Sequence, residues 1–167
     1  MRNFILVLLP VLALFLQTTF FRSYPLHGTV PDLILIVVVF HALFNGAFKG
    51  TIYGVICGLL EDLYVGRFIG INAVSKGVTA YLVGRLQGNV FKDNVLVGVI
   101  AVVVGTLLNS SLLFILSLAS FEVFNLDRSI FTSLFYQGIY NAVIAIPVYF
   151  WYFHSVNRGI LRESGDL

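Results

Sequence analysis

The sequence predicts an all-α membrane protein, with one transmembrane domain of about six helices over residues 1–167. Hydrophobic residues make up 59% of the chain and charged residues only 11%, and the mean hydropathy is +0.96. A soluble domain carries about 25% charged residues, so this composition lies far outside the soluble range. Several uncharged runs also reach the length of about 18 residues that a helix needs to cross the hydrocarbon core.

Short polar connections separate the apolar segments. The first apolar run is longer than the core of a secretory signal and lacks a cleavage site, so we interpret it as a span. Pro31 and Asp32 open the second span, because proline fits the first turn of a helix and an acid suits its N-terminus. β-Branched residues at 34–39 would suit a buried strand in water, but lipid requires a helix with all backbone groups paired. The spans expected are 3–21, 33–45, 47–63, 72–87, 95–121 and 129–154.

The distribution of Lys and Arg predicts that both termini are cytoplasmic, because basic residues favour the inner side of a membrane. With six spans, the inner set is Arg2, Lys49, Arg85, Lys92, Arg158 and Arg162. The smaller outer set is Arg22, Arg67 and Arg128. Near the end of the sixth span, we interpret Tyr149, Trp151 and Tyr152 as an aromatic belt at the interface.

Glycines at every fourth position form a ridge of small residues in the third span: Gly46, Gly50, Gly54 and Gly58. Such a ridge lets another helix backbone approach closely, which stabilises helix pairs in lipid. Two interpretations remain open. The ridge packs against another helix of this chain, or it receives a helix of a partner or of a second copy.

A polar hairpin follows this ridge, where ionisable residues stand inside an apolar region. It consists of Glu61, Asp62, Gly66, Gly70, Asn72 and Lys76. If the third and fourth spans form a hairpin, Lys76 can pair with one of the two acids, which lowers the cost of burying charge. The hairpin is then either a structural ion pair beside a helix end or a polar site for a ligand, ion or partner.

Further polar residues inside the spans are typical of contacts between helices. Asn109, Ser110 and Ser111 lie in the fifth span, and Gln137 and Asn141 share one face of the sixth. None of these patterns forms a catalytic or metal-binding constellation, and the histidines are widely spaced. We therefore expect no enzyme activity, metal or cofactor. The small, scattered net charge of +2 also argues against nucleic acid as a partner.

Part of the chain resembles a known family. The residues that carry the resemblance are Pro31-Asp32, the stretch Gly-Leu-Leu-Glu-Asp-Leu at 58–63, Gly66, Gly-Ile-Asn-Ala at 70–73 and Tyr-Leu-Val-Gly-Arg-Leu at 81–86. This pattern is similar to MreD, the rod shape-determining membrane protein family of bacteria. By match to the motif, the signature positions are Asp62, Gly66, Gly70 and Asn72.

The resemblance implies a non-enzymatic scaffold in the bacterial cytoplasmic membrane. The partners it implies are a bitopic MreC-like protein, an elongation-class glycosyltransferase, a transpeptidase and, indirectly, the actin-like MreB filament; a homo-oligomer is also possible. It further implies a fold similar to the substrate-binding subunits of energy-coupling-factor transporters. The alternative function is therefore a vitamin-binding subunit of such a transporter, which would hold a tightly bound small molecule.

Overall fold

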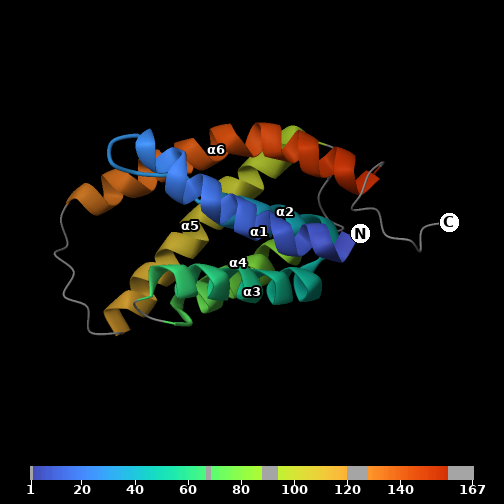
Figure 1. Ribbon diagram of the computed structural model, residues 1–167, viewed down its shortest axis with the longest axis horizontal. Helices are drawn as coiled ribbons and strands as arrows, with labels where there is room; N and C mark the ends of the chain where they lie inside the picture. The colour runs from blue at the N-terminus through green and yellow to red at the C-terminus, as the bar shows by residue number, and fades with distance from the viewer. Residues whose placement is uncertain (1, 67–68, 88–93, 120–127, 158–167) are drawn as a thin grey trace.

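The computed structural model describes residues 2–66, 69–87, 94–119 and 128–157, which form an elongated bundle of helices (Figure 1). Arg67, Lys92, Arg158 and Arg162 lie outside these ranges. In chain order the helices are α1 (Arg2–Thr19), the short 3-10 helix η1 (Phe21–Ser23), α2 (Leu33–Asn45), α3 (Ala47–Val65), α4 (Ile71–Gly84), α5 (Val95–Ala119) and α6 (Arg128–Asn157).

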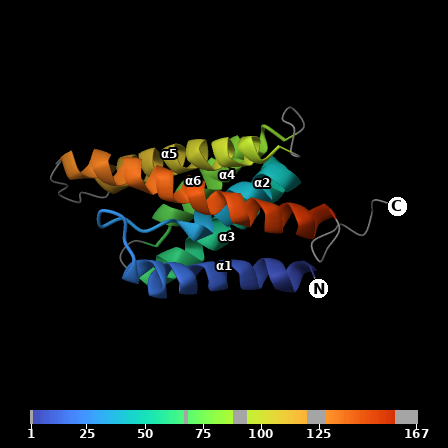
Figure 2. The same cartoon turned by 90° about the horizontal axis from the view of Figure 1, so that it is seen from above.

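Helix α2 is the core of the bundle. It contacts all five other α-helices, and its residues from Leu33 to Leu43 are all buried. A helix that is apolar on every side is stable only when it is enclosed on every side, which explains the unbroken run of Leu, Ile and Val at 33–39. Seen from above, α1 lies along one side of the bundle and α5 and α6 along the other (Figure 2).

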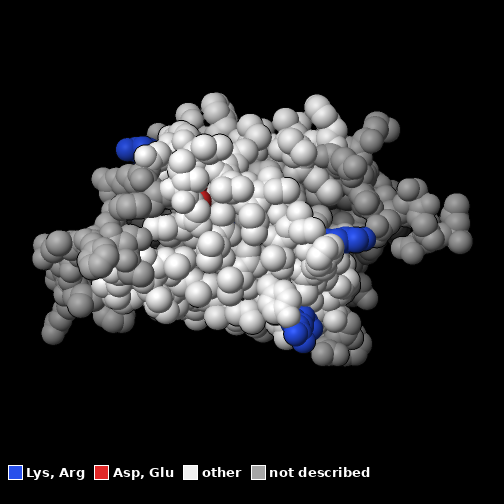
Figure 3. All heavy atoms as spheres, turned by 90° about the horizontal axis from the view of Figure 1, so that it is seen from below, with Lys and Arg blue, Asp and Glu red and all other residues white. Residues whose placement is uncertain are grey.

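The outer surface of the bundle is apolar. Large hydrophobic side chains on α1, α5 and α6 are well exposed, including Phe4 at 72%, Leu96 at 67% and Phe135 at 67%. A space-filling view shows a broad face that is uncharged except for one small acidic patch, with basic side chains towards its two ends (Figure 3). By length and composition alone, two of the described helical stretches, Phe4–Ser23 and Val95–Leu118, could cross a membrane. Exposed apolar surface of this extent is typical of a protein surrounded by lipid.

Helix α1 is joined to α3 through a hydrogen bond that follows from a proline. Pro10 lies inside α1 and has no N–H, so the carbonyl of Leu6 one turn earlier loses its partner in the helix. The hydroxyl of Tyr53 in α3 donates to that carbonyl at 2.9 Å. Tyr53 therefore satisfies the backbone group that Pro10 leaves open and fixes the start of α1 on the bundle.

The predicted position of Pro31 and the predicted end of the fourth span differ from the structure. Helix α2 begins at Leu33 with Asp32 as its N-cap, so Pro31 precedes the cap and does not occupy the first turn. Helix α4 ends at Gly84 and not at residue 87. The following residues form tighter turns in which Leu86 N–H donates to Val83 and Gln87 N–H donates to Gly84.

The expected aromatic belt on α6 is only partly at the surface. Trp151 is 46% exposed, whereas Tyr149 and Tyr152 are almost completely buried. Residues three apart share one face of a helix, and this face of α6 packs on α2, where both tyrosine rings lie near Phe40 and Phe44. The interpretation of these two tyrosines as interfacial residues was therefore wrong.

Candidate functional site

The centre of the polar region is a lysine enclosed between two carboxylates. The Nζ atom of Lys76, in α4, lies 2.8 Å from Oδ2 of Asp32 and 2.7 Å from Oε2 of Glu61. Lys76 is fully buried, and Asp32 and Glu61 are 6% and 9% exposed. The contact with Asp32 is also a hydrogen bond. Burying a charge is costly unless it is paired, and here one ammonium group serves two carboxylates from different helices.

Asp32 has a second role in the same place. Its Oδ1 atom accepts a hydrogen bond from the N–H of Leu35 at 2.8 Å, which caps the N-terminus of α2. The capping geometry leaves Oδ2 directed at Lys76. The sequence led to Glu61 or Asp62 as the partner of Lys76, and Asp32 was missed. The signal that could have revealed it is an acid at the outer end of a neighbouring span, close to the expected depth of Lys76.

Asp62 has different partners from Glu61 and holds the start of α4. Its carboxylate accepts from the N–H groups of Gly70, Asn72 and Ala73 at 2.8, 3.1 and 3.1 Å, and from Nδ2 of Asn72 at 2.9 Å. Adjacent residues on a helix point about 100° apart, so Glu61 and Asp62 reach different partners. Asp62 thus closes the hairpin, with Gly66 and Gly70 at positive φ on either side of the turn.

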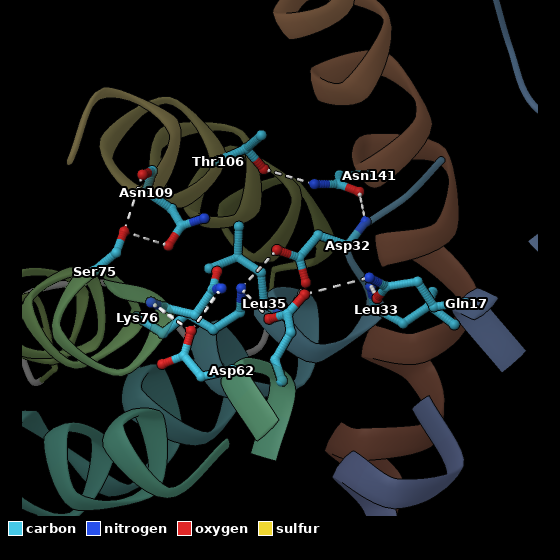
Figure 4. Close-up of polar contacts among 12 residues, drawn as sticks. Gln17, Asp32, Leu33, Leu35, Asp62, Ser75, Lys76, Thr106, Asn109 and Asn141 are labelled. Atoms are coloured by element: carbon cyan, nitrogen blue, oxygen red, sulfur yellow. Dashed lines mark hydrogen bonds and ion pairs between the residues drawn. The ribbon is translucent and has the colours of Figure 1, made fainter. Parts of the chain in front are cut away.

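The ion pairs extend into a network that joins side chains of α1, α3, α4, α5 and α6 to the start of α2, where Asp32 and backbone N–H groups take part (Figure 4). On one side, the N–H of Asp32 donates to Asn141 of α6, and Asn141 donates to Thr106 of α5, both at 2.9 Å. On the other side, Gln17 of α1 accepts from Leu33 N–H at 3.0 Å and lies 3.5 Å from Glu61.

A parallel contact ties α4 directly to α5. The hydroxyl of Ser75 lies 2.7 Å from Oδ1 and 2.9 Å from the carbonyl oxygen of Asn109, and both residues are buried. The Asn109 and Asn141 positions thus join neighbouring helices. Gln137, one turn before Asn141, is only half-buried.

The glycine ridge of α3 faces other helices of the same chain. A Cβ atom at Gly54 would lie 2.7 Å from the carbonyl oxygen of Lys76, and one at Gly58 would overlap Asn72 and Ala73. Gly50 lies against Ala42 of α2, and Gly46 against the side chain of Gln87. Because side chains are missing along this ridge, α4 approaches α3 closely, which brings Lys76 within reach of Glu61.

The structure and its polar network define the class of protein. The bundle has an apolar exterior and buries Asp32, Glu61, Asp62 and Lys76 together, as an integral membrane protein does with charges inside the bilayer. In the described part of the chain, no three His, Cys, Asp or Glu side chains gather where they could hold a metal ion. Asp32, Glu61, Asp62 and Lys76 engage one another or the backbone, so the described network is an internal tie between helices.

The comparison with protein families then identifies the chain. The model of the rod shape-determining protein MreD family matches residues 1–158, and the chain belongs to this family. It is a non-enzymatic membrane protein with a role in rod-shape determination. No curated protein and no solved structure matches the chain, so similarity to energy-coupling-factor transporter subunits stays a prediction.

Proposed function

We propose that this protein is a scaffold of the bacterial cell-elongation machinery in the cytoplasmic membrane. The observation that carries the proposal is the polar network, which ties all six α-helices into one body and leaves the apolar exterior for neighbouring proteins. A chain of this size with short connections has little mass outside the membrane. Its partners therefore meet mainly helix faces and short loops.

The proposed partners are a bitopic MreC-like protein, an elongation-class glycosyltransferase and a transpeptidase, and through them the actin-like MreB filament. The ridge of α3 is occupied by α4 and α2 of the same chain, so partner helices must bind elsewhere. The exposed face of α1 is one such surface, with Phe4, Leu8 and Phe15 all at least half exposed. A second copy of the chain could use the same surface.

The test replaces the native copy with tagged variants in a rod-shaped host. We expect Asp62→Ala and Gly54→Leu to weaken partner recovery and to give rounded cells, because both loosen the α3–α4 hairpin that supports the bundle. Partner recovery is measured by mild-detergent purification and mass spectrometry, and cell width by microscopy. Gly138→Ala is the control, since a Cβ there would meet no atom within 4 Å.

Two results would contradict the proposal. Normal partner recovery and normal shape in both variants, with the protein present in membranes, would exclude the hairpin as a functional element. Recovery of a transporter core with two ATPases, or of a tightly bound small molecule, would instead support the vitamin-binding alternative.

A further inference from the structure

A cluster of aromatic side chains lies at the end of the bundle where α1 ends and α6 begins (Figure 1). Three of its rings are more than half exposed: Phe20 at 55%, Tyr24 at 65% and Phe135 at 67%. The members of this aromatic cluster come from the connection between α1 and α2 and from α6, and they are Phe20, Phe21, Tyr24, Phe135, Tyr136 and Tyr140.

The connection between α1 and α2 is held against α6 by specific contacts. Leu26 and Thr29 exchange two backbone hydrogen bonds at 2.9 Å, which close a tight turn. The hydroxyl of Tyr140 in α6 donates to the carbonyl of Tyr24 at 3.1 Å, and the ring of Tyr140 lies 5.8 Å from that of Phe21. The aromatic cluster is therefore a built part of the fold.

The exposed backbone of this connection cannot lie in the hydrocarbon core. Residues 22–28 are exposed, and those after η1 are not helical. Irregular backbone that faces lipid would leave polar groups without partners, so it does not occur within the hydrocarbon region. The edge of the hydrocarbon core must pass between the end of α1 and this connection.

The lengths of two helices place this edge at the same level. Helix α1 has 18 residues and is about 27 Å long, and the aromatic cluster begins directly after it. In α6, the stretch from Tyr136 to Asn157 has 22 residues and is about 33 Å long. Both lengths are close to the hydrocarbon thickness of about 30 Å, so both helices put the aromatic cluster at a membrane boundary.

A tyrosine on another side of the bundle lies at the same end. Tyr64 is in the last turn of α3, which ends beside the start of α4 at this end of the bundle (Figure 1), and it is 56% exposed. Tyr149 and Tyr152, near the other end of α6, are buried. Exposed tyrosines on two sides of the bundle thus suit one and the same interface.

We propose that the aromatic cluster is an interfacial anchor, which lies among the phospholipid headgroups and fixes the depth of the bundle in the bilayer. The rings of Phe20 and Phe135 face the upper part of the acyl chains, and the hydroxyl of Tyr24 faces the headgroups. Arg22, which is exposed in η1, places its cation at the same level. In the orientation expected from the basic residues, the leaflet is the outer one.

The first experiment measures the depth of the aromatic cluster in vesicles that contain the full-length protein. The single tryptophan, Trp151, is removed by Trp151→Phe, and Tyr24→Trp or Leu107→Trp is added to this background. Leu107 is 54% exposed near the middle of α5 and serves as the control. Phosphatidylcholines with bromine near the start or near the end of the acyl chains quench tryptophan fluorescence at the corresponding depth.

We expect the tryptophan of Tyr24→Trp to be quenched more by the shallow bromines, and that of Leu107→Trp more by the deep ones. Stronger quenching of Tyr24→Trp by the deep bromines would overturn the proposal, because the aromatic cluster would then lie inside the hydrocarbon core. Quenching by aqueous iodide but by neither lipid would also overturn it, because the aromatic cluster would then lie in water.

The second experiment tests whether the aromatic cluster fixes the depth of the bundle. Native Trp151, near the other end of α6, is the reporter. Replacing Phe20, Tyr24 and Phe135 together by Ala should change the ratio of shallow to deep quenching of Trp151, because the bundle is no longer held at one level. The matched control replaces Val104 and Leu107, which are exposed on α5, by Ala and should leave the ratio unchanged.

An unchanged ratio in the triple variant would contradict the anchoring role. Equal changes in the triple variant and the control would also contradict it, since any loss of exposed apolar side chains would then have the same effect. Thermal unfolding of each variant, at a midpoint within a few degrees of the native protein, shows that the comparison is made on folded protein.

Discussion

At the scale of single residues, Lys76 is the position on which the interior depends. It is the ion-pair partner of both Asp32 and Glu61, and its side chain is fully buried. Removing one member of a buried ion pair is far more costly than replacing the whole set by neutral groups. The difference in the free energy of unfolding between these two replacements measures the cost of leaving the two carboxylates without their cation.

We expect Lys76→Met to destabilise the protein by about 3–5 kcal/mol, because it leaves two carboxylates buried without a cation. The measurement is thermal or denaturant unfolding of the purified protein in detergent. Adding Asp32→Asn and Glu61→Gln to the same chain should recover most of the loss, since the site is then neutral. Arg22→Met, at an exposed arginine in η1, is the control. A triple variant as unstable as the single one would contradict this account.

The residues of this site were only partly accessible from the sequence. An acid pair and a lysine in an apolar region indicated an ion pair, but did not show whether Glu61 or Asp62 is the partner of Lys76. The role of Asp32 could not be predicted, because it depends on how the start of α2 lies against α4. The glycine ridge showed that α3 packs closely against a helix, but the spacing alone does not name that helix.

At the scale of helices, α3 and α4 approach each other closely along the glycine ridge. At Gly54 the neighbouring backbone and Ala80 leave no room for a methyl group. Each contact between α3 and α4 also sets the distance between Glu61 and Lys76. The packing of these two helices therefore affects the strength of the ion pair.

We expect Gly54→Ala to lower stability by about 1–3 kcal/mol, because the added methyl group forces the two backbones apart. Gly138→Ala in α6 places the same group in open space and should be neutral or stabilising by up to about 1 kcal/mol through helix propensity. Unfolding midpoints of the two variants in one detergent make the comparison. An equal loss in both would mean that backbone conformation, and not crowding, sets the effect.

The attachment of α1 offers a second prediction at this scale. Tyr53→Phe should cost about 1–3 kcal/mol, because the carbonyl of Leu6 is left without a partner. In a Pro10→Ala background the helix supplies its own N–H, so the same substitution should cost much less. The native protein, the two single variants and the double variant form a double-mutant cycle. Their free energies of unfolding measure the coupling between Tyr53 and Pro10.

The control for this cycle is Tyr140→Phe, which removes a hydroxyl that donates to the backbone of Tyr24 at 3.1 Å. Its cost should be the same in the native chain and in the Pro10→Ala background, because that carbonyl has no relation to the proline. Zero coupling between Tyr53 and Pro10 would show that α1 is held by packing alone.

At the scale of the whole molecule, the prediction concerns orientation in the membrane. The single cysteine, Cys57, is buried, and a Cys57→Ala chain provides a background for labelling. In that background, Lys49→Cys should react with an impermeant maleimide only in inverted vesicles. Arg22→Cys should react in intact spheroplasts, because it follows α1 at the other end of the bundle. The reverse pattern would contradict cytoplasmic termini.

The class of the protein could be predicted from the sequence, but the arrangement of its helices could be predicted only in part. Composition and run length indicated apolar helices with short connections, because lipid leaves the backbone few other choices. The central place of α2 was not predicted, since uniform hydrophobicity is shared by helices facing lipid and helices enclosed by protein. Tyr149 and Tyr152 show the same ambiguity, because an aromatic residue near a helix end suits either an interface or a core.

The order in which the charged residues appear along the chain has a consequence for biogenesis. Asp32 and Glu61 leave the ribosome before Lys76, so a nascent chain that stops short of α4 carries two carboxylates among apolar segments with no cation to meet them. The network therefore closes only late in synthesis, when α5 and α6 also bring Thr106 and Asn141. A truncated or mis-inserted chain exposes unpaired acids inside the bilayer, a chemical mark by which membrane quality control can distinguish it from the finished protein.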